Sequence, residues 1–120
     1  MGRMEKVNQQ VKREVGCIIQ QELSDPRLEF VTILAATVSP DLRTAIINYS
    51  VLNTAKRDEA QKALNSAAGA IHRILGGRLD MRNIPHLTFV YDSSIEDSFK
   101  MDQVLKELDQ RVTENDNSDD

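Results

Sequence analysis

The chain has 120 residues, of which 40% are hydrophobic and 28% are charged, as in an ordinary soluble globular domain. This length supports one domain with a real core, but not two. No apolar run approaches the roughly 20 residues that a membrane helix needs, no signal-peptide core is present, and the single cysteine, Cys17, excludes an internal disulfide. We therefore expect a cytoplasmic protein without a membrane partner.

The net charge of −4 is unevenly distributed along the chain. Residues 1–91 carry 12 Lys and Arg against 9 Asp and Glu, a balance of +3, whereas residues 92–120 carry 3 against 10, a balance of −7. The acidity therefore belongs to the C-terminal part. The mildly basic body permits RNA binding without requiring it.

The first predicted element is an amphipathic helix over residues 3–23. Five apolar residues fall within one arc of its helical wheel, and on the opposite side Lys6 and Arg13 line up seven residues apart, with Lys12 near the edge. Such a stripe is typical of a solvated face. The alternative interpretation is a set of contacts to nucleic-acid phosphates. The apolar residues are Val7, Val11, Val15, Ile18 and Ile19.

Two strands are predicted next. Pro26 disfavours helical geometry in the residue before it, so the helix should end there. Residues 30–38 read as a strand whose two faces are too similar to say which is buried, and in residues 44–52 the face with Ala45, Ile47, Tyr49 and Val51 is the better core candidate. The turn residues at 39–42 predict an antiparallel hairpin.

Residues 58–79 predict two helices separated by the small residues of 66–69. Gly69 would begin the second helix, so the amides around Gly69 and Ala70 would be free, and free amides at a helix start suit a phosphate. The alternative is a packing contact in which small residues let two elements touch. Ala67 and Ala68 complete this predicted joint.

Basic side chains accompany the joint and could neutralise neighbouring phosphates. They are Lys62, His72, Arg73, Arg78 and Arg82. A short third strand over residues 87–91 follows and gives the element order αββααβ. Residues 95–108 predict one further amphipathic helix, and residues 109–120 form an acidic tail that we expect to be disordered.

The sequence offers little support for an enzyme. His72 and His86 are predicted on different elements, and His86 reads as an ordinary exposed histidine. No glycine-rich phosphate motif, metal-ligand cluster or nucleophile elbow is present. We expect no catalytic residue, cofactor or metal.

Several short motifs together resemble the bacterial ribosome-binding factor A family over residues 1–108. They are Asp25-Pro26-Arg27, Val38-Ser39-Pro40-Asp41-Leu42, Ala67-Ala68-Gly69, Pro85-His86-Leu87-Thr88-Phe89 and Tyr91-Asp92 leading to Ser94-Ile95-Glu96. No single motif is specific for this family, but the order and spacing of all of them together are specific.

The resemblance implies an α+β fold of the type II KH class. Such a fold has a three-stranded sheet packed by helices on one face, and an Ala-x-Gly kink that interrupts the central helix. It also implies a non-enzymatic, monomeric assembly factor. That factor would bind the immature 30S subunit and its 16S rRNA, support 5′-end maturation and matter in the cold, with possible partners among other assembly factors, including GTPases.

RNA recognition in this reading depends on shape and backbone, because aromatic residues are only 4% of the chain. The alternative is a protein-interaction module that binds a ribosomal protein or maturation factor without touching RNA.

Overall fold

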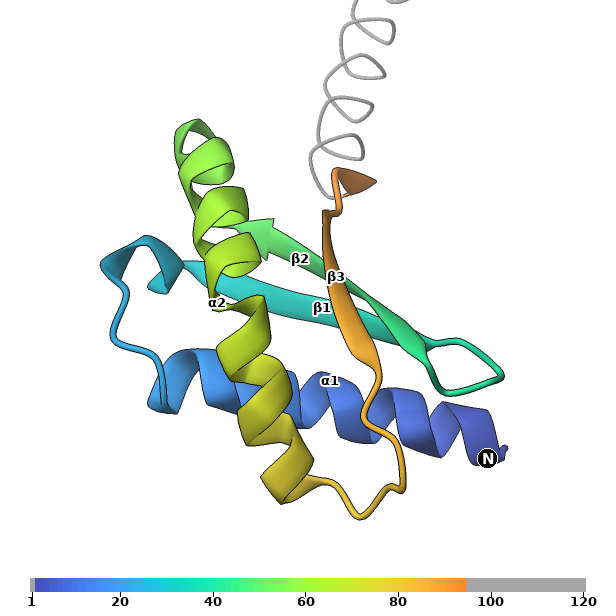
Figure 1. The fold of residues 1–120 in the computed structure, drawn as a ribbon. Coiled ribbons are helices and arrows are strands. Elements are labelled where there is room, and N and C mark those ends of the chain that lie inside the picture. Colours follow the sequence, from blue (N-terminus) through green and yellow to red (C-terminus); the bar gives the residue numbers. More distant parts are fainter. Residues whose placement is uncertain (1, 95–120) are drawn as a thin grey trace, which may run out of the picture.

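The computed structural model describes residues 2–94. Its elements are α1 (Arg3–Gln21), the 3-10 turn η1 (Pro26–Leu28), β1 (Val31–Val38), β2 (Thr44–Val51), η2 (Thr54–Lys56), α2 (Arg57–Arg78) and β3 (His86–Tyr91) (Figure 1). The predicted helix 95–108, the domain boundary at residue 108 and the acidic tail 109–120 lie outside the described residues. The predicted α+β class is confirmed, with strands and helices near their expected positions.

The three strands form one sheet in the order β1-β2-β3. β1 and β2 pair antiparallel, as the predicted hairpin requires. β2 and β3 pair parallel, from Thr44 opposite His86 to Tyr49 opposite Tyr91. Parallel neighbours need a crossover connection, and α2 supplies it.

A β-bulge in β1 explains why its buried face could not be read from alternation. The register with β2 shifts between Ile33 and Ala35, so the extra residue reverses the alternation within the strand. Val31 is buried before the bulge and Ala36 and Val38 after it. No single face of β1 is therefore apolar along its length.

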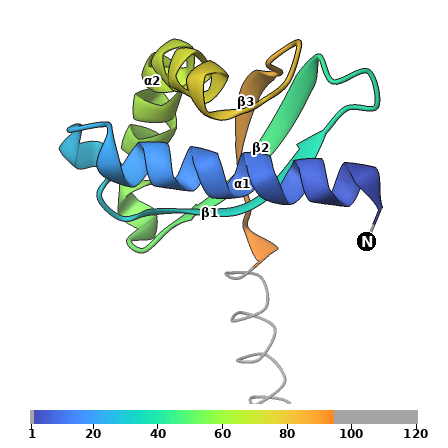
Figure 2. The ribbon, with the colours of Figure 1, turned by 90° about the horizontal axis from the view of Figure 1, so that it is seen from below.

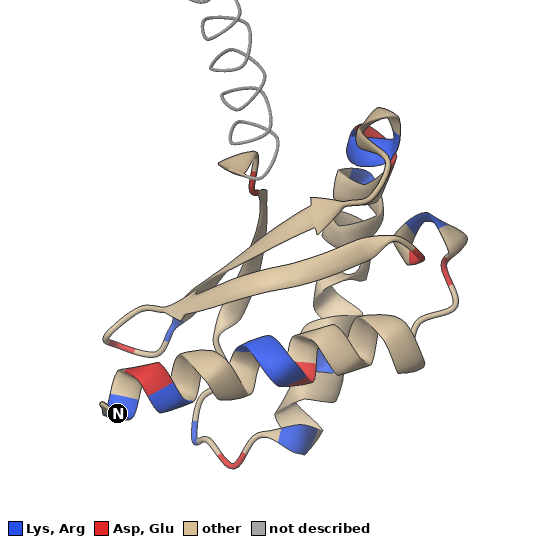
Figure 3. Cartoon of the chain, turned by 180° about the vertical axis from the view of Figure 1, so that it is seen from behind, with Lys and Arg blue, Asp and Glu red and all other residues tan. Residues whose placement is uncertain are grey.

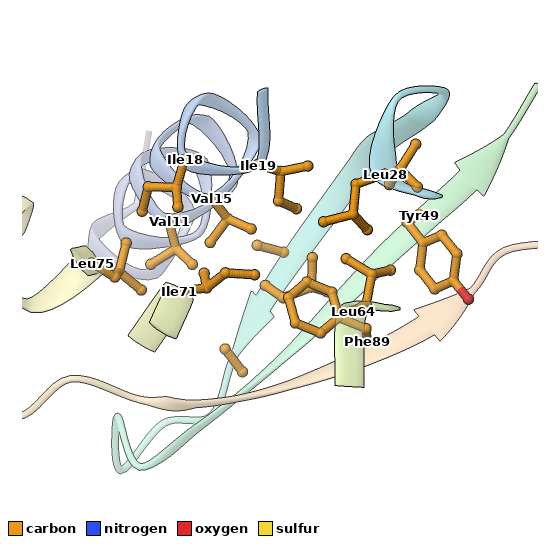
Figure 4. Close-up of a cluster of buried hydrophobic side chains, with 14 of the residues drawn as sticks. Val11, Val15, Ile18, Ile19, Leu28, Tyr49, Leu64, Ile71, Leu75 and Phe89 are labelled. Carbon is orange, nitrogen blue, oxygen red and sulfur yellow. The ribbon is translucent and has the colours of Figure 1, made fainter. Parts of the chain in front are cut away.

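Both helices pack on the same face of the sheet (Figures 1 and 2). α1 contributes the predicted apolar arc to the core, and the expected face of β2 is buried throughout (Figure 4). The buried residues of α2 are Ala60, Ala63, Leu64, Ile71 and Leu75. Burying each large aliphatic side chain contributes about 1.5–3 kcal/mol. The core therefore fixes α1 and α2 against the sheet and determines which of their sides face solvent.

A polar network joins β2 and β3 to α2 within this packing. The Tyr49 hydroxyl donates to Oε1 of Gln61 at 2.5 Å, and Nε2 of Gln61 donates to the carbonyl oxygen of Phe89 at 3.0 Å. Burial raises the pKa of the Tyr49 hydroxyl above its usual range. One glutamine thus connects β2, α2 and β3.

The prediction of two separate central helices is wrong. α2 is a single helix from Arg57 to Arg78 that includes all the small residues of 66–70. Alanine is the best helix former, and one glycine costs only about 1 kcal/mol, so this stretch can remain helical. The ribbon of α2 nevertheless changes direction between its two halves (Figure 2). The small-residue segment therefore accompanies a bend in a continuous helix.

Candidate nucleic-acid interface

A groove runs between α1 and β1, and three cations from α1 line it. Lys6, Lys12 and Arg13 are exposed along one side of the helix, and the groove encloses about 720 Å³. Its lining contains no Asp or Glu. The lining residues are Lys6, Gln9, Gln10, Lys12, Arg13, Gly16, Cys17, Gln20, Thr32 and Ile33.

The position of this groove follows from how α1 sits on β1. The buried residues Val11, Val15 and Ile18 hold one side of α1 on the sheet, and near the helix start Oδ1 of Asn8 accepts from the amide of Val38 at 2.9 Å. The opposite side of α1 stays exposed. Cations, amide side chains and one threonine hydroxyl together can contact phosphates and sugar hydroxyls.

The small-residue stretch of α2 does not present the predicted free amides. Gly69 and Ala70 lie well inside α2, where backbone N–H groups are used by the helix's own hydrogen bonds. Gly69 is exposed and a Cβ added there would meet nothing within 4 Å, whereas Ala67 and Ala68 pack partly against the core. The surface at Gly69 is therefore open, but phosphate binding by bare amides at a helix start is not available there.

The predicted cations of α2 fall into two groups. Lys62, Arg73 and Arg82 are exposed, and none of them forms an ion pair within residues 2–94. Arg78 instead lies 3.3 Å from Glu14 and 2.8 Å from Glu22, both on the α1 side. Arg78 thus links the two helices.

The predicted site residues consequently form two surfaces. Lys6 and Arg13 lie in the groove, which no residue of α2 lines. The other predicted residues follow α2 and the loop after it, while the three strands carry no charged residue (Figure 3). The helical wheel predicts Lys12 only at the edge of the charged stripe, and its place in the groove depends on how α1 is rotated on β1.

The structure also brings His72 and His86 together. Their rings stack with centroids 5.0 Å apart and an angle of 5° between their planes. No sequence signal could show this contact, because it depends on how β3 packs beside α2 in the folded chain.

The titratable groups of the described residues form no metal-binding cluster. No group of three or more His, Cys, Asp and Glu in residues 2–94 could hold a metal ion. The lowered carboxyl pKa values belong to local turns, where Arg27 acts on Asp25, Ser39 on Asp41 and Ser94 on Asp92. Within this part of the chain, no helix is long and apolar enough to cross a membrane.

Comparisons with known proteins address the whole chain. The family model described as ribosome-binding factor A matches residues 3–105. The chain belongs to the ribosome-binding factor A family. Ribosome-binding factor A from Streptococcus mutans is 41% identical over 111 residues, covering 91% of this chain and 96% of the relative. The Streptococcus gordonii protein of the same name is 42% identical over 109 residues, covering 89% and 95%.

Solved structures of the ribosome-binding factor A family share the fold. The crystal structure of the Thermus thermophilus protein superposes with a TM-score of 0.69 at 28% identity, covering 76% of this chain and 97% of that one. A homology model of the Thermus thermophilus factor, fitted into a cryo-EM map of its 30S complex, gives a TM-score of 0.62 at 29% identity, covering 72% and 91%. The KH-like class implied by the resemblance is therefore confirmed.

Proposed function

We propose that this chain binds the immature small ribosomal subunit through its 16S rRNA and assists late maturation of that RNA, including its 5′ end. The groove between α1 and β1 carries this proposal, because it gathers Lys6, Lys12 and Arg13 with no carboxylate among its lining residues. The family membership and the 30S complex of the Thermus thermophilus factor support it.

The mechanism is recognition of RNA backbone by two cationic surfaces. The groove holds one sugar–phosphate segment, and Lys62, Arg73 and Arg82 near α2 neutralise another. The three strands contribute no charge. Contacts of this kind position a protein on a folded RNA without reading much sequence, which suits a factor that stabilises one RNA arrangement without catalysing a reaction.

Subunit binding by a charge-reversed groove tests the proposal. The double variant Lys12→Glu and Arg13→Glu should weaken binding to purified small-subunit precursors and lower the slope of log affinity against log salt by roughly one for each lost phosphate contact. Arg43→Glu combined with Lys56→Glu is the matched control, because both residues are exposed cations outside the groove and the change in net charge is the same. Equal binding by the groove variant and the control would contradict the role of the groove.

The proposal also covers where the protein acts in the cell and at which temperatures its loss matters most. The protein acts as a monomer in the cytoplasm, with other assembly factors, including GTPases, as further partners. RNA helices rearrange more slowly in the cold, so a strain lacking the protein should accumulate unprocessed 16S precursor, and more of it at low temperature. Equal precursor levels in the two strains at both temperatures would contradict the maturation role.

The second candidate, a protein-interaction module, predicts a different result. Such a module would keep its ribosomal-protein or maturation-factor partner after ribonuclease treatment of the complex. Loss of the complex after the same treatment supports direct RNA contact.

A further inference from the structure

The stacked rings of His72 and His86 form a rigid pair at the junction of α2 and β3. The centroid distance of 5.0 Å and the interplanar angle of 5° describe an offset parallel stack. His72 is half-buried, whereas His86 is exposed. The pair therefore has one ring against the protein and one ring at the surface.

Local contacts hold both rings in place. Nε2 of His72 lies 3.1 Å from the carbonyl oxygen of Ile84, and because a carbonyl only accepts, this nitrogen carries the proton. Pro85 is fully buried, and the amide of His86 donates to the carbonyl oxygen of Arg43 at 2.9 Å. The loop residue Ile84 thus fixes the His72 ring while the start of β3 fixes His86, so little freedom is lost when a third ring joins the stack.

Few other aromatic rings among the described residues are available to a ligand. Tyr49 and Phe89 are buried. Tyr91 packs edge-on against Tyr49, and the guanidinium of Arg57 lies over its ring at 4.2 Å. Phe30 is exposed but directly precedes β1 at the other edge of the sheet. His86 is therefore an exposed ring at the junction of α2 and β3.

Two of those cations flank the pair in the chain. Arg73 follows His72 directly in α2, and Arg82 lies in the short loop between α2 and β3. Both are exposed and form no ion pair within residues 2–94. An exposed flat ring with unpaired cations close by in the chain suits one nucleotide, whose base stacks while its phosphates are neutralised.

We propose that the stacked His72–His86 pair is a platform on which an unpaired nucleobase of single-stranded RNA stacks. This inference rests on the proposed function and adds a base contact to a surface otherwise devoted to phosphates. The exposed face of His86 receives the base, and His72 supports the ring from behind. Stacking of this kind tolerates any base, with purines favoured by their larger area.

A fluorescent base analogue tests the platform in the full-length protein. A short single-stranded oligouridylate carrying one 2-aminopurine should lose fluorescence when the wild-type protein binds, because uridines stack weakly and stacking on the protein quenches that base. His86→Ala should abolish the quenching and weaken affinity roughly five-fold or more. His86→Phe, which keeps a flat ring, should retain both. Thr88→Ala, at another exposed position of β3, is the matched control and should behave as wild type.

An oligonucleotide with an abasic site in place of 2-aminopurine separates stacking from charge. His86→Ala should bind this oligonucleotide as the wild type does. Absence of quenching by the wild-type protein, or an equal loss of affinity for both oligonucleotides, would overturn the proposal. If subunit binding falls with Lys12→Glu and Arg13→Glu while His86→Ala binds the base-containing oligonucleotide normally, the platform is refuted and the proposed function stands.

Discussion

Nη2 of Arg78 lies 2.8 Å from Oε1 of Glu22, so the last residue of α2 is paired with the residue that caps the end of α1. Nη1 of the same guanidinium lies 3.3 Å from Glu14. Two carboxylates of α1 therefore hold one cation of α2, and the side chain of Arg78 is only 29% exposed. The sequence predicts Arg78 as an RNA contact. In the structure its guanidinium instead pairs with Glu14 and Glu22 and links the two helices.

Arg78→Ala should lower the free energy of unfolding by about 1 kcal/mol, because it removes both ion pairs and leaves two carboxylates near each other. Arg78→Lys should recover only part of this loss, since an ammonium group cannot form the same fork. Denaturant unfolding measures the effect. Arg43→Ala, at an exposed position without an ion pair in residues 2–94, is the control. An unchanged midpoint for Arg78→Ala would show that the link contributes nothing.

Gly69→Ala should raise the free energy of unfolding by roughly 0.5–1 kcal/mol, because alanine is the better helix former and its Cβ meets nothing within 4 Å. Subunit binding should stay the same, since no free amide is lost. Thermal unfolding and a binding titration provide the two measurements. Destabilisation would indicate that the bend in α2 needs glycine at this position.

Gly69→Asp tests whether RNA binds over the exposed surface of α2 at Gly69. A folded variant should bind the small subunit less tightly if RNA backbone passes over this part of α2, because a carboxylate would then face phosphates. Gly69→Asn has similar size without charge and is the matched control. Equal subunit binding by the two variants would remove this part of α2 from the interface.

Tyr49→Phe should lower the free energy of unfolding by about 1 kcal/mol at neutral pH, because Gln61 loses its hydroxyl donor. Burial raises the pKa of Tyr49 above its ordinary value of 10.0. The folded state therefore disfavours the ionised form, and the stability that this group contributes is complete below pH 10 and is lost as the pH rises further. The advantage of the wild type over Tyr49→Phe should shrink in that range, as measured by unfolding at a series of pH values. A constant difference would contradict this assignment.

Asp25→Asn should make the η1 turn less sensitive to acid. Hydrogen bonds from the Arg27 side chain and amide hold the pKa of Asp25 below its ordinary value of 3.8. This stabilisation is present above that value and is lost as the pH falls through the lower folded pKa. NMR shifts of the Arg27 amide should follow this titration in the wild type and not in the variant. Identical acid titrations in both proteins would exclude the carboxylate as the cause.

Much of the fold could be predicted from sequence because its elements carry local signals. The apolar spacing of α1, the proline after it and the alternation in β2 each depend on neighbours within a few residues, and the structure confirms all three. The face of β1 could not be predicted, because a bulge at Ile33 and Ala35 depends on pairing with β2. Local signals do not report how many residues of one strand oppose the other.

In the candidate site, too, some features could be predicted from local sequence and others depend on long-range packing. The exposure of Lys6 and Arg13 followed from the helical period alone, but their sharing a groove with Lys12 depends on where α1 sits on β1. The split of α2 was predicted from small residues that can either interrupt a helix or continue it. The structure continues this stretch as one helix, and a contact such as His72 with His86 depends wholly on long-range packing.

The parallel pairing of β2 with β3 also sets an order of assembly for the nascent polypeptide. The hairpin of β1 and β2 can close as soon as residue 51 leaves the ribosomal exit tunnel, but one edge of β2 finds its partner only after the whole of α2 and residues 86–91 have been synthesised. Until then, the unpaired edge of β2 is a place where another chain could add a strand. We expect translation pauses to be harmful when they fall after residue 51 has emerged and before residue 91 has emerged, because each would prolong the lifetime of that incomplete sheet.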